Sequence, residues 1–226
     1  IPSGFLYWKT GVFGGGIDNP PIGQLLIASF IKAAGLDYAL FSEQHLVLFR
    51  LPVLLLGLLG GIVLYALARF LFDRTTASIA LFLYALSPNI LAHASLATLD
   101  YPIAFFVLLT LYAALAFVRK PRPLPFLGLC ISLGLALGPK VQAGLFIPPL
   151  AVIFAAHAGS LRAHPKAGLK TALAALLLLF LIPALLLNLA YLHVPLLDGH
   201  GILPPEFTTA LGQKILNEIK GEESGF

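Results

Sequence analysis

Long apolar runs, nearly free of charged residues, constrain the fold of this sequence more than any other feature. Apolar residues make up 59% of its 226 residues and charged ones only 11%, whereas soluble domains carry about 25% charged residues. This composition excludes a water-soluble enzyme and a disordered chain. It predicts an all-α, polytopic membrane protein, because helices satisfy every backbone polar group inside lipid.

Six segments are long and apolar enough, or nearly so, to cross a hydrocarbon core that needs about 20 residues per helix. The fourth and fifth are short, and Gly138-Pro139 between them is a strong turn signal, which favours tilted or broken helices there. The expected spans are residues 50–68, 76–95, 101–118, 124–138, 141–157 and 170–190.

The loops between these spans alternate in charge. Lys and Arg concentrate in short cytoplasmic loops, and one set of loops holds a single acid, Asp73, so we expect that set to be cytoplasmic and both ends of the chain to lie outside. No basic patch with interleaved aromatic residues is present, and we expect no nucleic-acid partner. The basic residues of this set are Arg69, Arg74, Arg119, Lys120, Arg122, Arg162, Lys166 and Lys170.

Three regions follow from this division: an extracytoplasmic loop (1–49), a bundle of six helices (50–190) and the start of an extracytoplasmic loop or domain (191–226) with a short helix over 207–220. The sequence has no Met and no terminal signal, and we expect an internal piece of a longer protein. In the first region, residues 22–36 form an amphipathic stretch. Its spacing suits a helix in the interface plane, which either covers the core or shapes the substrate site. Its expected face is Leu25, Leu26, Ser29, Phe30 and Ala33.

Ionisable residues at the membrane edge are costly and are therefore functional hypotheses. Asp100, between the second and third spans, is either a helix N-cap or a carboxylate that orients an acceptor or holds a divalent metal ion. Lys140 is either a lysine whose ammonium reaches the interface or a point charge for a phosphate. Arg50 is an outer anchor or a ligand contact, and the lone His93 is more typical of a hydrogen-bonded packing residue than of a metal ligand.

Soluble catalytic signatures are missing from the sequence: it contains no GxSxG, Walker A, HExxH or CxxC pattern. Its polar residues gather at the outer edge of the spans, whereas a transporter places them near the midplane, often in two repeated halves. This favours interfacial chemistry. The alternative is a multi-span permease or a structural membrane subunit.

Four motifs together resemble the GT-C membrane glycosyltransferases, specifically the family 39 group of protein O-mannosyltransferases and aminoarabinose transferases. They cover most of residues 1–150. Asn19 stands where the family often has His, and Gln24 where it often has Lys. The motifs are Gly4-Phe5-Leu6-Tyr7-Trp8 with Asp18-Asn19-Pro20-Pro21; Arg50-Leu51-Pro52; Ser87-Pro88-Asn89 through Ala97-Thr98-Leu99-Asp100-Tyr101-Pro102; and Gly134 through Lys140.

The resemblance implies transfer of a sugar from a polyprenyl-phosphate carrier to a protein or lipid acceptor, with the active site outside a bacterial inner or plasma membrane. Asp100 is then the catalytic candidate, with a divalent metal ion as an open possibility, while Lys140 and Arg50 neutralise the leaving phosphate. The family's acidic pair, which supplies the base, is expected just upstream of Ile1. Further substrate-binding candidates are Asn19, Pro20, Pro21, His93, Tyr101 and Gln142.

Overall fold

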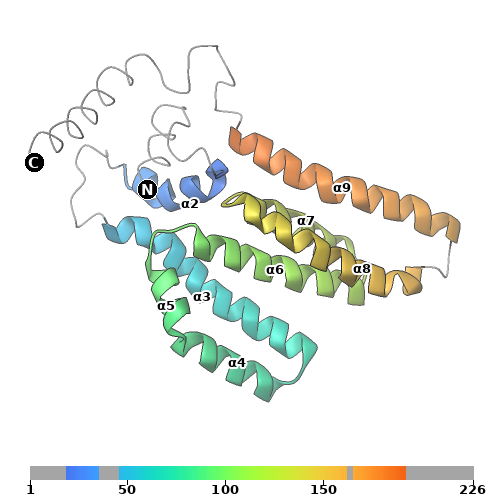
Figure 1. Cartoon of the computed structure of the whole chain (residues 1–226), viewed down its shortest axis with the longest axis horizontal. Helices are drawn as coiled ribbons and strands as arrows, with labels where there is room; N and C mark the ends of the chain where they lie inside the picture. The colour runs from blue at the N-terminus through green and yellow to red at the C-terminus, as the bar shows by residue number, and fades with distance from the viewer. Residues whose placement is uncertain (1–18, 36–45, 162–164, 192–226) are drawn as a thin grey trace, which may run out of the picture.

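The computed structural model describes residues 19–35, 46–161 and 165–191, and within these ranges every regular element is a helix (Figure 1). The expected helix over 207–220 lies outside the described residues, as do residues 1–18. The elements are α2 (Pro21–Ala33), α3 (Leu46–Leu71), α4 (Arg74–Leu86), α5 (Pro88–Ser95), α6 (Asp100–Arg119), α7 (Pro123–Leu137), the 3-10 helix η3 (Val141–Phe146), α8 (Ile147–Leu161) and α9 (Pro165–Tyr191).

Each expected span coincides with one helix or with a consecutive pair of helices, but their lengths differ. Within the described ranges, α3 from Val47 onward and α6 are long and apolar enough to cross a membrane, and α4 with α5 forms a third, bent candidate. The apolar helices Pro123–Leu137 (α7) and Gln142–Ala156 (η3 with α8) are shorter. The side chains of α9 are described only from Leu177 onward, and there the helix is apolar as far as Ala190. By length and composition, the described residues thus contain two or three candidate crossing elements, and the six expected from hydropathy are not shown.

Proline explains why the second expected span is broken. The segment 76–95 is two helices, α4 and α5, bent by 60° at their junction. Pro88 begins α5, where its missing N–H is harmless, and Ser87 before it is extended with ψ 117°. The single helix expected over 76–95 is therefore wrong.

The fifth expected span also begins differently from a regular α-helix. Residues 141–146 form η3, preceded by Lys140 in an extended conformation with φ −153°. Helix α8 then starts at Ile147 with Pro148 and Pro149 in its first turn, which is where a helix tolerates proline.

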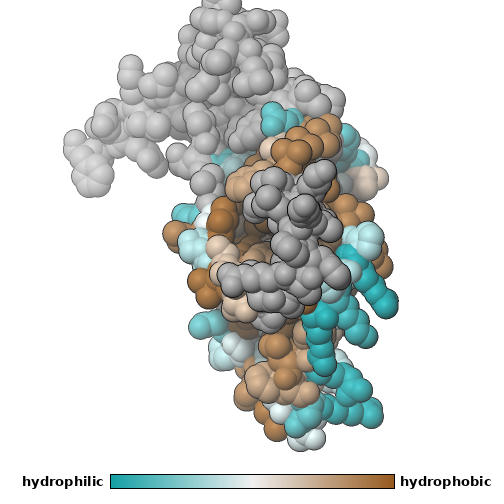
Figure 2. Space-filling model, turned by 90° about the vertical axis from the view of Figure 1, so that its right-hand side faces the viewer, coloured by the Kyte–Doolittle hydropathy of each residue, from teal (hydrophilic) through white to brown (hydrophobic). Residues whose placement is uncertain are grey.

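The chain reverses direction at two opposite ends of the bundle. Figure 1 shows the α3–α4 and α6–α7 turns at one end, and the α5–α6 and α7–η3 turns at the other. We call the end with the α3–α4 and α6–α7 turns the basic end. Figure 2 views the molecule from this side and shows hydrophilic side chains along one edge, beside apolar ones. The described basic residues of this end, all exposed, are Arg69, Arg74, Arg119, Lys120 and Arg122.

Two contacts order the basic end. Arg119 Nη1 donates to the Phe70 carbonyl at 3.2 Å, and its guanidinium carbon lies 4.8 Å from the centre of the Phe70 ring, which ties the end of α6 to the end of α3. The Asp73 carboxylate caps α4 by accepting the Thr76 N–H at 2.7 Å. This bond lowers the pKa of the Asp73 carboxyl.

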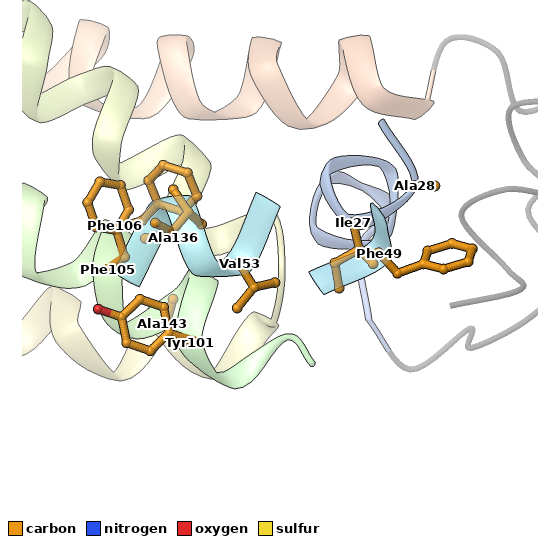
Figure 3. Close-up of a cluster of buried hydrophobic side chains, with 10 residues drawn as sticks. Ile27, Ala28, Phe49, Val53, Tyr101, Phe105, Phe106, Ala136 and Ala143 are labelled. Atoms are coloured by element: carbon orange, nitrogen blue, oxygen red, sulfur yellow. The ribbon is translucent and has the colours of Figure 1, made fainter. Parts of the chain in front are cut away.

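The core at the opposite end joins α2 to α3, α6, α7 and η3. Figure 3 shows its buried side chains, which include Ile27 and Ala28 of α2 beside Phe49 of α3. The face expected for α2 was wrong: Gln24, Ile27 and Ala28 are buried, whereas Leu25 and Leu26 are half-buried and Ala33 is exposed. Because α2 is apolar almost all round, its pattern did not identify the packed face. Its contacts support the interpretation of a helix that covers the core.

Candidate functional site

Three segments that are distant in sequence meet at the end of the bundle opposite the basic end. Glycines make their close approach possible: a Cβ built on Gly23 of α2 would lie 2.7 Å from Leu99 Cδ2 and 2.9 Å from Pro139 Cα, and one built on Gly138 would lie 2.6 Å from Ile22 Cβ. The start of α2 therefore packs closely against the α5–α6 and α7–η3 turns. These two turns carry Asp100 and Lys140.

Asp100 and Lys140 form an ion pair across 40 residues of sequence. Lys140 Nζ donates to Asp100 Oδ1 at 2.5 Å. The two side chains are 26% and 49% exposed, Lys140 being the more buried. An ammonium has three donors and a carboxylate has room for several hydrogen bonds, so both groups keep capacity for a ligand on their exposed sides.

The local backbone explains how each charge reaches this place. Asp100 is the first residue of α6, and Leu99 holds the N-cap position. The N-cap interpretation of Asp100 is therefore wrong, although its negative charge still favours the positive end of the helix. Lys140 follows the buried Pro139 and precedes η3, so the Gly138-Pro139 turn aims it back at α6.

A buried hydroxyl adjoins the ion pair. Thr98 Oγ1, two residues before Asp100, is buried and has no hydrogen-bond partner among the described residues. A buried polar atom without a partner costs free energy, and such atoms often mark a place where water or a ligand binds. The motif Ala97-Thr98-Leu99-Asp100 contained this signal, but Thr98 was not among the expected site residues.

The other expected site residues are not all brought to the ion pair. Pro20, Pro21 and Tyr101 are buried, and Asn19 is half-buried. Arg50 is exposed near the start of α3, and no hydrogen bond or ion pair joins its side chain to Asp100 or Lys140 in the described ranges. His93 on α5 and Gln142 on η3 are also exposed. The roles of these residues remain predictions.

The donor set around Asp100 gives little support to a divalent metal ion. No group of three His, Cys, Asp or Glu side chains that could hold a metal occurs among the described residues. Asp100 is instead bound to the Lys140 ammonium, which a cation would first have to displace.

An apolar pocket lies beyond the ion pair on the η3 side. Its cavity volume is about 20 Å³, little more than one water molecule needs, and α6, α7, η3 and α8 form its walls. Ala143 and Phe146 of η3 line it, so its wall begins within one turn of Lys140. Other lining residues are Val107, Leu111, Leu133, Leu150 and Ile153.

Comparison with known families identifies the chain. The family model described as dolichyl-phosphate-mannose-protein mannosyltransferase matches residues 18–186. The chain belongs to this family. No curated protein and no solved structure matches it.

Membership in the mannosyltransferase family agrees with the resemblance inferred from the motifs. The family is one of GT-C membrane glycosyltransferases that use polyprenyl-phosphate sugar donors. The match spans both turns of the site, including Asp100 and Lys140. Together with the apolar helices, it identifies an integral membrane glycosyltransferase rather than a permease or a structural subunit.

Proposed function

We propose that this protein transfers a sugar from a polyprenyl-phosphate carrier to a protein or lipid acceptor at the outer face of the membrane. The observation that carries the proposal is the contact between Lys140 and Asp100, which lie 40 residues apart, in a chain that belongs to a family of such transferases. Both residues were predicted from the sequence as site residues, because an ionisable side chain at the membrane edge costs free energy.

Lys140 acts on the donor. The phosphate of the carrier gains negative charge as the bond to the sugar breaks, and a fixed cation stabilises that charge most where it is largest. The Lys140 side chain is 26% exposed, and its ammonium uses one of its three N–H groups for Asp100. The remaining donors are available to phosphate oxygens, and Arg50 is the candidate for a second cation.

Asp100 has two effects on the reaction. Its carboxylate holds the Lys140 ammonium in one position, so less freedom is lost when the phosphate arrives. It is also half exposed, and its outer oxygen can accept a hydrogen bond from an acceptor hydroxyl. Asp100 thus orients the acceptor relative to the departing phosphate.

The carrier's hydrocarbon tail requires an apolar surface beside the phosphate site. The pocket between α6, α7, η3 and α8 begins within one turn of Lys140 and is lined almost wholly by apolar side chains. The pocket is too small to enclose the tail, but its apolar wall supports a path in which the tail passes along this surface and continues into lipid.

The orientation of the bundle follows from its two ends. We assign six crossings to α3, α4 with α5, α6, α7, η3 with α8, and α9. The short helices are accommodated by local thinning of the bilayer. The basic end then faces the cytoplasm, and the ion pair faces outside, where the acceptor is located.

Measured sugar transfer by the protein in nanodiscs, with polyprenyl-phosphate mannose as donor, tests the proposal. Lys140→Ala should lower kcat/KM roughly ten- to hundredfold, because a hydrogen bond to a charged group is worth about 1.5–3 kcal/mol. Lys120→Ala, the same substitution at the basic end, is the matched control and should be neutral. Transfer at the unsubstituted rate by Lys140→Ala, with normal expression, would refute the role of Lys140.

A second variant separates pairing from catalysis. The exchanged pair, Asp100→Lys with Lys140→Asp, keeps an ion pair but moves the cation to α6. If the positions of the charges matter to the reaction, this variant should fold with only the modest loss of stability expected from a cation at a helix N-terminus and still be inactive. Full activity of the exchanged pair would show that the pair only stabilises the fold.

A further inference from the structure

Two tyrosines form a hydrogen-bonded cluster next to the first turn of α6, and one of them, Tyr84, was not among the expected site residues. Tyr84 lies near the end of α4, just before the 60° break, and Tyr101 is the second residue of α6. Their hydroxyl groups are hydrogen-bonded to each other. Tyr84 also donates to the Gly57 carbonyl of α3 at 2.6 Å.

The number of protons fixes the direction of these bonds. Each phenol has one O–H proton, and Tyr84 uses its proton for the Gly57 carbonyl. The bond between the two hydroxyls must therefore be donated by Tyr101 to the Tyr84 oxygen. The chain of bonds runs from Tyr101 through Tyr84 to the backbone of α3.

Helix α3 is shaped to receive both rings. A Cβ built on Gly60 would overlap the hydroxyl oxygens of both tyrosines, and one built on Gly61 would lie 3.3 Å from the Tyr84 ring. Tyr101 is only 4% exposed, and Figure 3 shows it within the core cluster. The cluster thus joins α3, α4 and α6. A hydrogen bond that the buried Tyr101 hydroxyl loses cannot be replaced by one to water.

The position of the cluster links it to the reaction. Tyr101 directly follows Asp100, so a bond that fixes Tyr101 also fixes the first turn of α6. No contact joins either phenol to the ion pair among the described residues, so their removal would leave both charges in place. Any effect on the ion pair must act through the backbone.

We propose that Tyr84 and Tyr101 are positioning residues that hold Asp100 against Lys140. The relevance of this positioning to catalysis rests on the proposed function, but the ion pair itself can be measured without any sugar donor. Tyr101 was expected to bind substrate. Its hydroxyl is instead hydrogen-bonded to Tyr84, so its proposed effect on the site is to fix the backbone next to Asp100.

Zero-length cross-linking measures the ion pair directly. A water-soluble carbodiimide activates the Asp100 carboxyl, the Lys140 amine attacks it, and an amide forms while the carbodiimide takes up the elements of water as a urea. The yield of the Asp100–Lys140 amide, measured by peptide mass spectrometry on protein in nanodiscs, reports how often the two groups meet.

Tyr84→Phe should lower this yield about fivefold or more, because it leaves the buried Tyr101 proton without an acceptor, a loss of about 1 kcal/mol or more. Tyr101→Phe should have a smaller effect, since Tyr84 keeps its bond to Gly57. The double variant should recover part of the yield lost in Tyr84→Phe, because no buried donor is then left unpaired.

Two controls isolate positioning from general loss of stability. Tyr112→Phe makes the same change on α6, at a ring that packs edge-on against Phe70, and should leave the yield unchanged. Arg119→Gln weakens the same pair of helices, α3 and α6, at the basic end, and should lower stability without lowering the yield.

Equal yields in Tyr84→Phe and the unsubstituted protein would overturn the proposal, even if Lys140→Ala abolishes transfer. A lowered yield in a protein without transferase activity would support the proposal and refute the proposed function instead. If Tyr84→Phe does not fold, Tyr101→Phe carries the test, and an unchanged yield in that variant would also overturn the proposal.

Discussion

Replacing Gly23 by alanine should destabilise the protein even though alanine is the better helix former. Gly23 lies in α2, where alanine is favoured over glycine by about 0.8–1.0 kcal/mol. The added Cβ would, however, lie 2.9 Å from both Cα and Cβ of Pro139 and 2.7 Å from Leu99 Cδ2. Overpacking of this kind costs about 1–3 kcal/mol, and the buried Pro139 ring cannot rotate away.

A matched glycine removes the helix-propensity effect from the comparison. Gly128→Ala in α7 brings the same gain, but its Cβ would meet only Ala113 Cβ, at an ordinary 3.9 Å. The difference between the two variants is then the overlap alone, about 1–3 kcal/mol. For a chain of this size it corresponds to a melting temperature roughly 2–12 °C lower for Gly23→Ala than for Gly128→Ala.

Cys130 provides the assay. It is the single cysteine of the sequence and is fully buried in α7, so its reaction with a fluorogenic maleimide during heating reports unfolding. Because Gly23 also supports the turn that carries Lys140, the yield of the Asp100–Lys140 cross-link should fall as well. A Gly23→Ala variant as stable as Gly128→Ala, or more stable, would refute the close packing of α2 against the two turns.

Three further outcomes follow from other contacts. Gly134→Ala should lower the melting temperature and loosen α9 from α7, because the added Cβ would lie 3.0 Å from Pro183 Cα; unchanged protease protection of α9 would contradict this. The Asp73 cap has a lowered folded-state pKa, so its stabilisation is complete above the unfolded-state pKa and is lost as pH falls through the folded value. Asp73→Asn should therefore show a smaller loss of stability below about pH 4 than the unsubstituted protein, and equal acid sensitivity would rule out this role. Single cysteines at positions 119–122 and 203–220 should react with an impermeant maleimide from opposite sides of the membrane; labelling from one side would contradict the topology.

Hydropathy predicted where the helical segments lie because the cost of exposing backbone and charge to lipid depends on local composition. It did not predict how the segments are built. Pro88 changes one expected span into two helices, and η3 replaces the first turns of another. Pro88 lies in the segment's own sequence, but a hydropathy average does not register the N–H that proline lacks or the extended conformation it favours in the residue before it.

The candidate site was predicted in part for a similar reason. Asp100 and Lys140 were recognisable because an ionisable residue at the membrane edge needs a partner. Tyr84 was not recognisable, because the sequence does not show which hydroxyl group a tyrosine will contact. Its role became visible only with the Tyr101 hydroxyl and the glycines of α3 beside it. The packed face of α2 was also hidden, since nearly every side chain of that helix is apolar.

The separation of 40 residues between Asp100 and Lys140 also sets an order of events during synthesis. At about 5–20 residues per second, Asp100 emerges roughly 2–8 s before the lysine that will neutralise it. During this interval the carboxylate must remain in water at the membrane surface, and α6 cannot settle more deeply without burying an unpaired charge. Insertion of the α7–η3 hairpin supplies the missing cation, so the site can assemble before α8 and α9 complete the fold.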